Sequence, residues 1–277
     1  MKRALLVVLA ACSHRPEPVK STALFDAIVI DTPPGISDLT LDDRGHVWAI
    51  AERDRIAVEM QPDGTQLVRH AIDGIPDGLD TEGLAFLGDG TFVVGTEGAH
   101  EATASLVFVE LRGDRLVATR TRELTSVELG VTLTVNHGVE AVCGHGDEVI
   151  AAIESVGDDG ARWAPLVHLR GDAMTVGKLR LTSDVGKISA LACNFRPDGS
   201  VDLRAIERHY KVSRILHGTL AAGASDVAPA VELDLEPVLH DTLNLEGLVV
   251  LPGGKLEAVN DNQGSRVAGP TELLRFR

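Results

Sequence analysis

The chain is poor in aromatic residues, which make up only 3% of its 277 positions, although 44% of the residues are apolar. Its core must therefore be built from valine, leucine, isoleucine and alanine. No long segment in the body of the chain has the periodicity of an amphipathic helix. Glycine is abundant by contrast, with 28 residues, many of them beside aspartate, as in short strands joined by tight turns. These features predict an all-β protein.

Several catalytic motifs are missing from the sequence. The segments GISDL and GASDV lack the second glycine of a serine-hydrolase elbow, and HEATA lacks the second histidine of a zinc-peptidase helix. The segment PGGKL has neither the spacing nor the hydroxyl residue of a phosphate-binding loop. A hydrolase nucleophile therefore has no support from any motif.

The one long apolar run lies at the N-terminus, in MKRALLVVLAAC. Lys2 and Arg3 precede apolar residues 4–11, a stretch too short to span a bilayer. We interpret residues 1–11 as a signal peptide. Residues 9–12 resemble the lipobox of bacterial lipoproteins, which implies that Cys12 is lipidated, with palmitate among its acyl chains, and becomes the mature N-terminus. Residues 12–22 would then be a tether, and Ser13 favours the outer membrane; a plain signal peptide is the alternative.

The mature chain is strongly acidic. Removing residues 1–11 leaves 24 basic against 41 acidic residues, a formal net charge of −17. Nucleic acids and anionic lipid surfaces are polyanions, so neither is an expected partner of the folded surface. We expect a monomer that contacts the membrane through its lipid anchor only, and the charge is compatible with binding cations.

Five stretches of the chain resemble one another, as in TEGLAFLGDGTFVVGTEG from Thr81. Each has a polar first residue, an apolar run, a glycine-containing turn, a second apolar run and an acidic last residue. The first residues, here called openers, are Ser37, Glu82, Glu140, Ser189 and Glu246. The last residues, here called closers, are Glu52, Glu97, Glu154, Glu207 and Asp261. Opener and closer are 15, 15, 14, 18 and 15 positions apart, so we expect them to be cross-strand neighbours at the open end of a hairpin.

Successive openers are 45 to 58 residues apart, and the segments between them also have the pattern of hairpins. Repeats of four strands at this spacing are typical of a β-propeller. The 266 residues from Cys12 onward predict five blades of about 52 residues, with six as the alternative. We expect one propeller domain over residues 23–277, closed by pairing TELLRFR at the C-terminus with FDAIVI near the N-terminus. A β-sandwich is the alternative fold.

The first two strands of a propeller blade lie nearest the axis, so all openers and closers would meet at one end of the central channel, here called the axial mouth. The acidic residues expected there are Glu52, Glu82, Glu97, Glu140, Glu154, Glu207, Glu246 and Asp261. Crowded carboxylates repel one another, and Ca²⁺ is satisfied by six to eight oxygens in loose geometry. We therefore predict a calcium site with these ligands: Glu52, Glu82, Glu97, Glu154, Glu246 and Asp261. The alternative is a purely structural role at the rim.

Two closers are followed by arginine, at Arg53 and Arg208. A guanidinium group can hold an anion in a bidentate fork. Beside a cation, the two arginines would form a pocket for a small anionic molecule or ester, with Glu140 as the base that activates water. His209 and Lys211 would lie near it. The alternative is that each arginine pairs with a glutamate of the neighbouring blade.

Three further residues are candidates for chemistry or cross-linking. His137 directly precedes an opening strand, and we interpret it as a hydrogen-bonded turn residue rather than a catalyst. Cys143 and Cys193 follow their openers by three and four residues, on opposite faces of neighbouring inner strands. Adjacent blades pack through such faces, so a disulfide is open to them, but we favour two buried free thiols.

The segments DTEGLAFLGDGTFVVGTEG and NLEGLVVLPGGKLEAVNDNQG resemble the repeated units of the phytase-like (esterase-like) β-propeller family, and the chain also looks related to the SdiA-regulated propellers of the periplasm. The resemblance spans about residues 30–277. It implies a calcium-binding propeller that hydrolyses a phosphoester or another ester. It carries over to the acidic openers and closers, whereas Ser37 and Ser189 depart from the pattern and interrupt the acidic ring.

Two classes of function remain. The first is a lipid-anchored, metal-dependent hydrolase of the cell envelope, in which a cation polarises the substrate. The second is a non-catalytic binding or scaffold lipoprotein. A propeller hosts many functions, so the fold does not decide between them.

Overall fold

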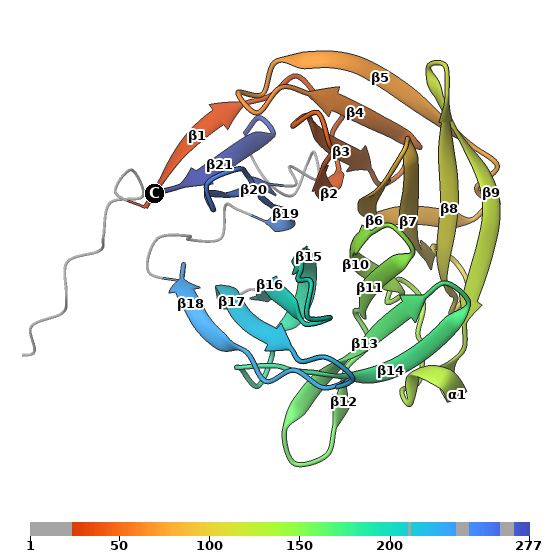
Figure 1. Cartoon of the computed structure of the whole chain (residues 1–277), viewed down its shortest axis with the longest axis vertical. Helices are drawn as coiled ribbons and strands as arrows, with labels where there is room; N and C mark the ends of the chain where they lie inside the picture. The colour runs from red at the N-terminus through yellow and green to blue at the C-terminus, as the bar shows by residue number, and fades with distance from the viewer. Residues whose placement is uncertain (1–23, 210–211, 237–243, 261–268) are drawn as a thin grey trace, which may run out of the picture.

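The computed structural model describes residues 24–209, 212–236, 244–260 and 269–277. Within these residues the chain forms a ring of antiparallel sheets around a central axis, seen end-on in Figure 1. In each sheet the strands are arranged side by side outward from the axis. The predicted all-β class is confirmed.

Blades 1 and 2 come from the N-terminal half of the chain. Blade 1 consists of β2 (Ile36–Leu41), β3 (Val47–Ala51), β4 (Ile56–Met60) and β5 (Gln66–Asp73). Blade 2 consists of β6 (Leu79–Gly88), β7 (Thr91–Gly98), β8 (Ala104–Arg112) and β9 (Arg115–Leu124). The outermost strands β5 and β9 also pair in parallel, with an ion pair between Asp73 and Arg115, so the two blades form one eight-stranded sheet.

Blades 3 and 4 follow after the short helix α1 (Ser126–Leu129). Blade 3 consists of β10 (Val139–His145), β11 (Glu148–Ile153), β13 (Arg162–Arg170) and β14 (Ala173–Arg180), with the two-residue strand β12 (Gly157–Asp158) added to β13. Blade 4 consists of β15 (Lys187–Phe195), β16 (Val201–His209), β17 (Val212–Leu220) and β18 (Ala230–Asp234).

Blade 5 contains both ends of the described chain. It consists of β19 (Leu245–Val250), β20 (Leu256–Asn260), β21 (Glu272–Phe276) and, as its outermost strand, β1 (Phe25–Val29). The last strand and the first pair in register from Phe25 opposite Phe276 to Val29 opposite Glu272. The predicted ring closure is therefore confirmed.

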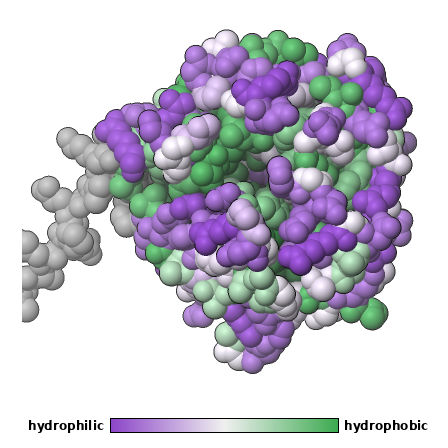
Figure 2. All heavy atoms as spheres, in the orientation of Figure 1, coloured by the Kyte–Doolittle hydropathy of each residue, from purple (hydrophilic) through white to green (hydrophobic). Residues whose placement is uncertain are grey.

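The innermost strands show that the ring is complete. Going round the axis, β2 contacts β6, β6 contacts β10, β10 contacts β15, β15 contacts β19, and β19 contacts β2 again. The described residues thus form five blades, the number favoured from the repeat length. Figure 2 shows that hydrophilic side chains cover much of the perimeter of the disc and that its face is hollowed near the middle.

The hydrophobic core is divided into five clusters, one between each pair of neighbouring blades. Side chains alternate between the two faces of each strand, so that in β6 Leu84 packs toward blade 1 and Ala85 toward blade 3. Most cluster members are valine, leucine, isoleucine and alanine, as the composition predicts. Every blade is therefore held by both of its neighbours.

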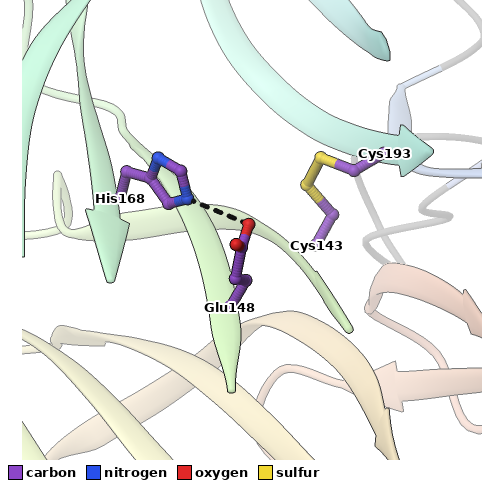
Figure 3. The surroundings of a disulfide bond; sticks show 4 residues. All are labelled: Cys143, Glu148, His168 and Cys193. Atoms are coloured by element: carbon purple, nitrogen blue, oxygen red, sulfur yellow. Dashed lines mark hydrogen bonds and ion pairs between the residues drawn. A yellow bond between two sulfur atoms is a disulfide. The ribbon is translucent and has the colours of Figure 1, made fainter. Parts of the chain in front are cut away.

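A disulfide joins Cys143 of β10 to Cys193 of β15 across the boundary between blades 3 and 4 (Figure 3). Their Cα atoms lie 5.7 Å apart, within the range that a disulfide requires. The preference for two free thiols was therefore wrong. The pattern had placed the cysteines on facing sides of adjacent inner strands, but sequence alone does not show how closely the two strands approach.

Within the described residues, no helix has the length and apolar character needed to cross a membrane. The predicted signal peptide, lipidation site and tether at residues 1–22 lie outside the residues that the structure describes, as do Lys211 and the closer Asp261.

Candidate functional site at the axial mouth

Each opener is the extra residue of a β-bulge at the start of its blade. In blade 2, Thr81 pairs with Thr96 and the next pair joins Gly83 to Gly95, so Glu82 has no residue opposite it. The first two strands of the other four blades show the same slip of one residue. The five extra residues are Ser37, Glu82, Glu140, Ser189 and Glu246. Because a bulge re-aims its extra side chain, each opener is freed from the alternation of the strand.

The three glutamate openers converge at the axis from blades 2, 3 and 5. Their exposed fractions are only 9% for Glu82, 7% for Glu140 and 7% for Glu246. The charges of Glu140 and Glu246 both act on Glu82, as do those of Glu97 and Glu52. Four blades therefore contribute carboxylates to one cluster, as predicted from the repeat.

Three of these carboxylates have a spacing suited to a metal ion. One oxygen each from Glu97, Glu140 and Glu154 can be chosen so that all three lie within 4.8 Å of one another, and all three residues are buried. Ca²⁺ binds oxygen at 2.3–2.6 Å, so ligands on opposite sides of the ion lie about 5 Å apart. The spacing of the three carboxylates therefore matches that of ligands around one calcium ion, but Lys187, which is ion-paired with Glu154, would have to move aside for the ion.

Neighbouring blades approach each other so closely that glycine is required after two of the glutamate openers, at Gly83 and Gly247. A Cβ atom on Gly83 would lie 2.6 Å from Val142 Cγ2, and one on Gly247 would lie 2.7 Å from the backbone nitrogen of Leu39. Both distances are shorter than normal contacts. The Glu-Gly-Leu pattern thus combines a carboxylate aimed at the axis with the smallest residue where inner strands meet.

The two serine openers form hydrogen bonds to the next blade instead of adding a charge to the cluster. Ser37 Oγ donates to the carbonyl oxygen of Thr81 at 2.8 Å, and Ser189 Oγ donates to that of Leu245 at 2.8 Å. In each case the acceptor immediately precedes the opener of the next blade. Serine therefore links consecutive blades, and the acidic ring is interrupted at blades 1 and 4, as the departures from the repeat predict.

Three closers occupy the predicted position at the open end of their hairpins. Glu97 pairs with Asp80, while the backbone nitrogens of Glu52 and Glu154 donate to carbonyl oxygens at the same position of blades 1 and 3, at 2.8 and 3.0 Å. Glu97 also accepts a hydrogen bond from the Gly138 nitrogen at 3.2 Å. This contact ties the closer of blade 2 to the start of blade 3.

The prediction that Glu207 joins the carboxylate ring was wrong by one residue. Glu207 pairs with Ile188, so Arg208 takes the closer position of blade 4. The carboxylate of Glu207 is fully buried and accepts hydrogen bonds from the backbone nitrogens and hydroxyls of Thr182 and Ser183. It therefore holds the loop before β15 instead of facing the axis.

Blade 4 brings two cations to the mouth. Arg208 forms a bidentate ion pair with Glu246 and lies 3.9 Å from Glu140. Lys187 forms an ion pair with Glu154 and also lies 3.9 Å from Glu140. The alternative that an arginine pairs with a neighbouring blade is thus confirmed for Arg208. Lys187 was not predicted, although its position two residues before an opener was visible in the repeat.

Arg53 and His137 lie at the edge of the mouth. The side chain of Arg53 is 79% exposed and pairs with the adjacent Glu52 at 3.0 Å, within its own blade. The Nδ1 atom of His137 lies 2.9 Å from the carbonyl oxygen of Val135 and 3.9 Å from Glu154. The interpretation of His137 as a hydrogen-bonded turn residue is confirmed, and Arg53 is the more accessible of the two predicted arginines.

Burial and mutual repulsion raise the pKa values of the central glutamates. Burial is the main cause at Glu97, whose pKa rises to about 7, and at Glu140, whose pKa rises to about 8. Lys187 opposes both shifts, whereas other glutamates strengthen them. The pKa of Glu82 is raised well above its ordinary value by burial and then by four neighbouring glutamates. The central carboxylates therefore share protons or need a further cation at neutral pH.

Asp38 is, after Lys187, a second residue of the mouth that the repeat pattern did not predict. It directly follows the opener Ser37 and is fully buried. Its carboxylate accepts hydrogen bonds from the backbone nitrogens of Leu39 at 2.8 Å and Leu84 at 2.9 Å. The other four blades have glycine or alanine at this position, so the departure was visible in the repeat.

The fold places the protein in the class of five-bladed β-propellers, and its candidate site is assembled from the inner strands of several blades. Residues 25–153, which cover blades 1 and 2 and the start of blade 3, match the model of the SdiA-regulated family. The predicted resemblance to SdiA-regulated propellers is confirmed for these residues. The phytase-like resemblance stays a prediction, and no curated protein matches the chain.

Solved structures with a similar fold are distant in sequence. The PQQ-bound aldose sugar dehydrogenase of Streptomyces coelicolor is 14% identical with a TM-score of 0.52, over 91% of this chain and 98% of that one. A glucose dehydrogenase-type oxidoreductase of Thermus thermophilus is 12% identical with a TM-score of 0.52, over 91% and 100%. An exo-β-1,3-galactanase of Phanerochaete chrysosporium is 10% identical with a TM-score of 0.57, over 90% and 64%. At these identities the likeness supports the fold alone.

Proposed function

We propose that this propeller binds one divalent cation, calcium, at its axial mouth. The observation that carries the proposal is the environment of Glu82. This carboxyl group is buried, and no described side chain forms an ion pair or hydrogen bond with it, while four glutamates act on it. A buried carboxylate without a partner is costly, and a bound cation would remove that cost.

The balance of charge at the mouth supports the same proposal. Among the described residues, six glutamates of the mouth face three cationic side chains, Arg53, Lys187 and Arg208, so these glutamates carry three negative charges in excess if all nine groups are ionised. The donors are carboxylate oxygens, which suit Ca²⁺ better than softer metals. The residues proposed as ligands are Glu82, Glu97, Glu140 and Glu154, with Glu52 and Glu246 near them. Asp261, a further predicted ligand, lies outside the described residues.

Hydrolysis of an ester or phosphoester is the activity proposed for this site. A bound cation would polarise the substrate oxygen. An oxygen of Glu140 that does not bind the cation would act as the general base that activates water. Arg53 is exposed enough to meet an anionic substrate, while Arg208 would need to leave Glu246 to do so.

The proposed place of action is the cell envelope, with Cys12 lipidated and the propeller held at the outer membrane by the tether. The proposal is supported by the lipobox-like residues 9–12 and by the signal-like segment before them. Metabolic labelling with a palmitate analogue, compared between the natural chain and Cys12→Ala, tests it directly.

Calorimetric titration with Ca²⁺ after chelator treatment tests the cation site. We expect saturable binding to residues 23–277 and a binding constant at least tenfold weaker in Glu82→Gln. The matched control is Glu123→Gln, which makes the same chemical change at an exposed position of β9. Absence of binding to the natural chain would refute the calcium site and leave Lys187 and Arg208 as the resident cations.

Activity is tested separately, with p-nitrophenyl phosphate and p-nitrophenyl acetate as probes in the presence of Ca²⁺. We expect turnover of one of the probes that is lost in Glu140→Gln. Calcium binding without turnover of either probe would favour the non-catalytic binding or scaffold lipoprotein.

A further inference from the structure

The carboxylate of Asp38 lies where the inner strands of three blades meet. It belongs to β2 of blade 1 and accepts the Leu84 nitrogen of β6 at 2.9 Å, in addition to the Leu39 nitrogen beside it at 2.8 Å. The backbone N–H of Val142 in β10 also faces this carboxylate and favours its charged form. Asp38 thus hydrogen-bonds to the inner strand of blade 2 and lies beside that of blade 3.

The two donors from other blades stand in the same relation to the proposed ligands. Leu84 is two residues after Glu82, and Val142 is two residues after Glu140. Each glutamate is the extra residue of a bulge, and a bulged segment has fewer ladder hydrogen bonds to hold it in place. A shared acceptor directly beyond both bulges therefore controls the distance between the two glutamates.

The remaining blades lack an equivalent contact. At the position of Asp38 they have Gly83, Ala141, Ala190 and Gly247, none of which has a side chain able to accept a hydrogen bond. The inner strands of blades 4 and 5 are linked through the same kind of serine contact that also joins blades 1 and 2, here from Ser189 to Leu245. The acceptor is thus confined to the side of the mouth that carries most of the carboxylates.

We propose that Asp38 is the positioning residue of the axial site, which sets the separation of Glu82 and Glu140 and thereby the preference for calcium over a smaller cation. The inference rests on the proposed function, because it concerns the same site. Asp38 does not contact the cation in this proposal; it acts through the backbone of β6 and β10.

The physical reason is that Ca²⁺ and Mg²⁺ differ in the oxygen distances they accept, 2.3–2.6 Å against 2.0–2.1 Å. Strands fixed by a common acceptor hold their carboxylates at one separation. Strands that lose this acceptor can bring their carboxylates closer together around Mg²⁺, or move them too far apart to hold either ion. Outer contacts of this kind typically change metal affinity by about 10- to 100-fold when they are removed.

The test compares Asp38→Asn with Thr40→Val. Asparagine keeps the shape of aspartate but points an NH₂ group at one of the backbone nitrogens, which breaks that contact. Thr40 Oγ1 accepts the Phe86 nitrogen at 3.0 Å, so the control also removes a bond between β2 and β6, but two residues farther from the glutamates. Should Asp38→Asn fail to fold, Asp38→Ala serves instead, since blades 3 and 4 have alanine at this position.

Calcium and magnesium affinities are measured calorimetrically for the natural chain and both variants. We expect at least a tenfold loss of calcium affinity and a lower ratio of calcium to magnesium affinity in Asp38→Asn, with both quantities within twofold of the natural values in Thr40→Val. A loss of folded protein would instead lower the number of calcium and magnesium ions bound per protein molecule and leave the ratio of the two affinities unchanged.

The two possible failures are distinguishable. If the natural chain binds calcium and Asp38→Asn has the same affinity and the same ratio, the positioning role is refuted while the cation site stands. If the natural chain itself binds no calcium, the proposed function fails, and the inference about Asp38 fails with it.

Discussion

The stability of the metal-free protein is expected to fall as the pH rises from 6.5 to 8. Glu97 and Glu140 have folded pKa values of about 7 and about 8, above the ordinary value of 4.5. In this range the folded protein keeps protons on these groups that the unfolded chain has already released. The unfolded state therefore binds fewer protons, and raising the pH favours unfolding.

The expected magnitude follows from these two values. One unit of pKa shift corresponds to 1.36 kcal/mol. Between pH 6.5 and 8 the folded protein keeps the proton on Glu140 over most of the range and the proton on Glu97 over a smaller part. Over this range the free energy of unfolding should therefore fall by about 2 kcal/mol in total. Glu82 acts in the same direction. The upper part of the pH range is chosen because burial lowers the pKa of His168, which has the opposite effect below about pH 6.5.

Urea denaturation of residues 23–277 in the presence of a chelator measures this change. The same titration with saturating Ca²⁺ should show a much weaker dependence on pH, because the ion replaces the protons. In Glu82→Gln the slope should be shallower, whereas Glu123→Gln should keep it. A stability that is constant or rises between pH 6.5 and 8 without calcium would refute the picture of mutually repelling glutamates.

Two further changes probe the frame around the mouth. In Gly247→Ala the new Cβ would lie 2.7 Å from the Leu39 nitrogen, so we expect the free energy of unfolding to fall by about 1–3 kcal/mol, and an unchanged denaturation midpoint would contradict the close packing of β19 on β2. The disulfide closes a loop of 50 residues, for which chain entropy predicts up to about 4 kcal/mol. Replacing both cysteines by alanine should therefore lower the midpoint, and dithiothreitol should lower it only in the natural chain.

The main architecture could be predicted because it depends on local regularity. A constant distance between opener and closer requires a hairpin of constant length, and five such hairpins at similar spacing leave few folds other than a propeller. The closing strand pair of Phe25–Val29 with Glu272–Phe276 followed from the need to avoid an open sheet edge. None of these inferences needed a contact between side chains.

The errors arose where one residue of register decides the outcome. The hairpin of blade 4 is longer than the others, and its pairing brings Glu207 opposite Ile188. A shift of one position exchanges the direction of a side chain, so Arg208 replaces an expected carboxylate at the mouth. The number of residues between opener and closer could not show this, because it does not separate the length of the turn from the register of the two strands.

Asp38 and Lys187 were missed for a different reason. The prediction used the residues that the repeats share, whereas both of these residues stand at positions where the repeats differ. The other copies have glycine or alanine where Asp38 stands, and Gly35, Asp80, Gly138 and Asn244 where Lys187 stands. Their partners, the backbone nitrogen of Leu84 and a pair of glutamates, come from other blades and are brought near only by closure of the ring.

These departures explain how the site differs from a symmetrical ring. Five identical repeats would place a glutamate opener and an acidic closer in every blade, and their repulsion would oppose folding without any cation of the protein's own. Serine at blades 1 and 4 removes two of these charges, and Arg208 and Lys187 in blade 4 neutralise others. The carboxylates without an ion pair among the described residues are left in blade 2, at Glu82 and Glu97, where Asp38 hydrogen-bonds to the inner strand. The mouth is therefore most acidic at blade 2, so a cation is expected next to Glu82, on the side away from Lys187 and Arg208.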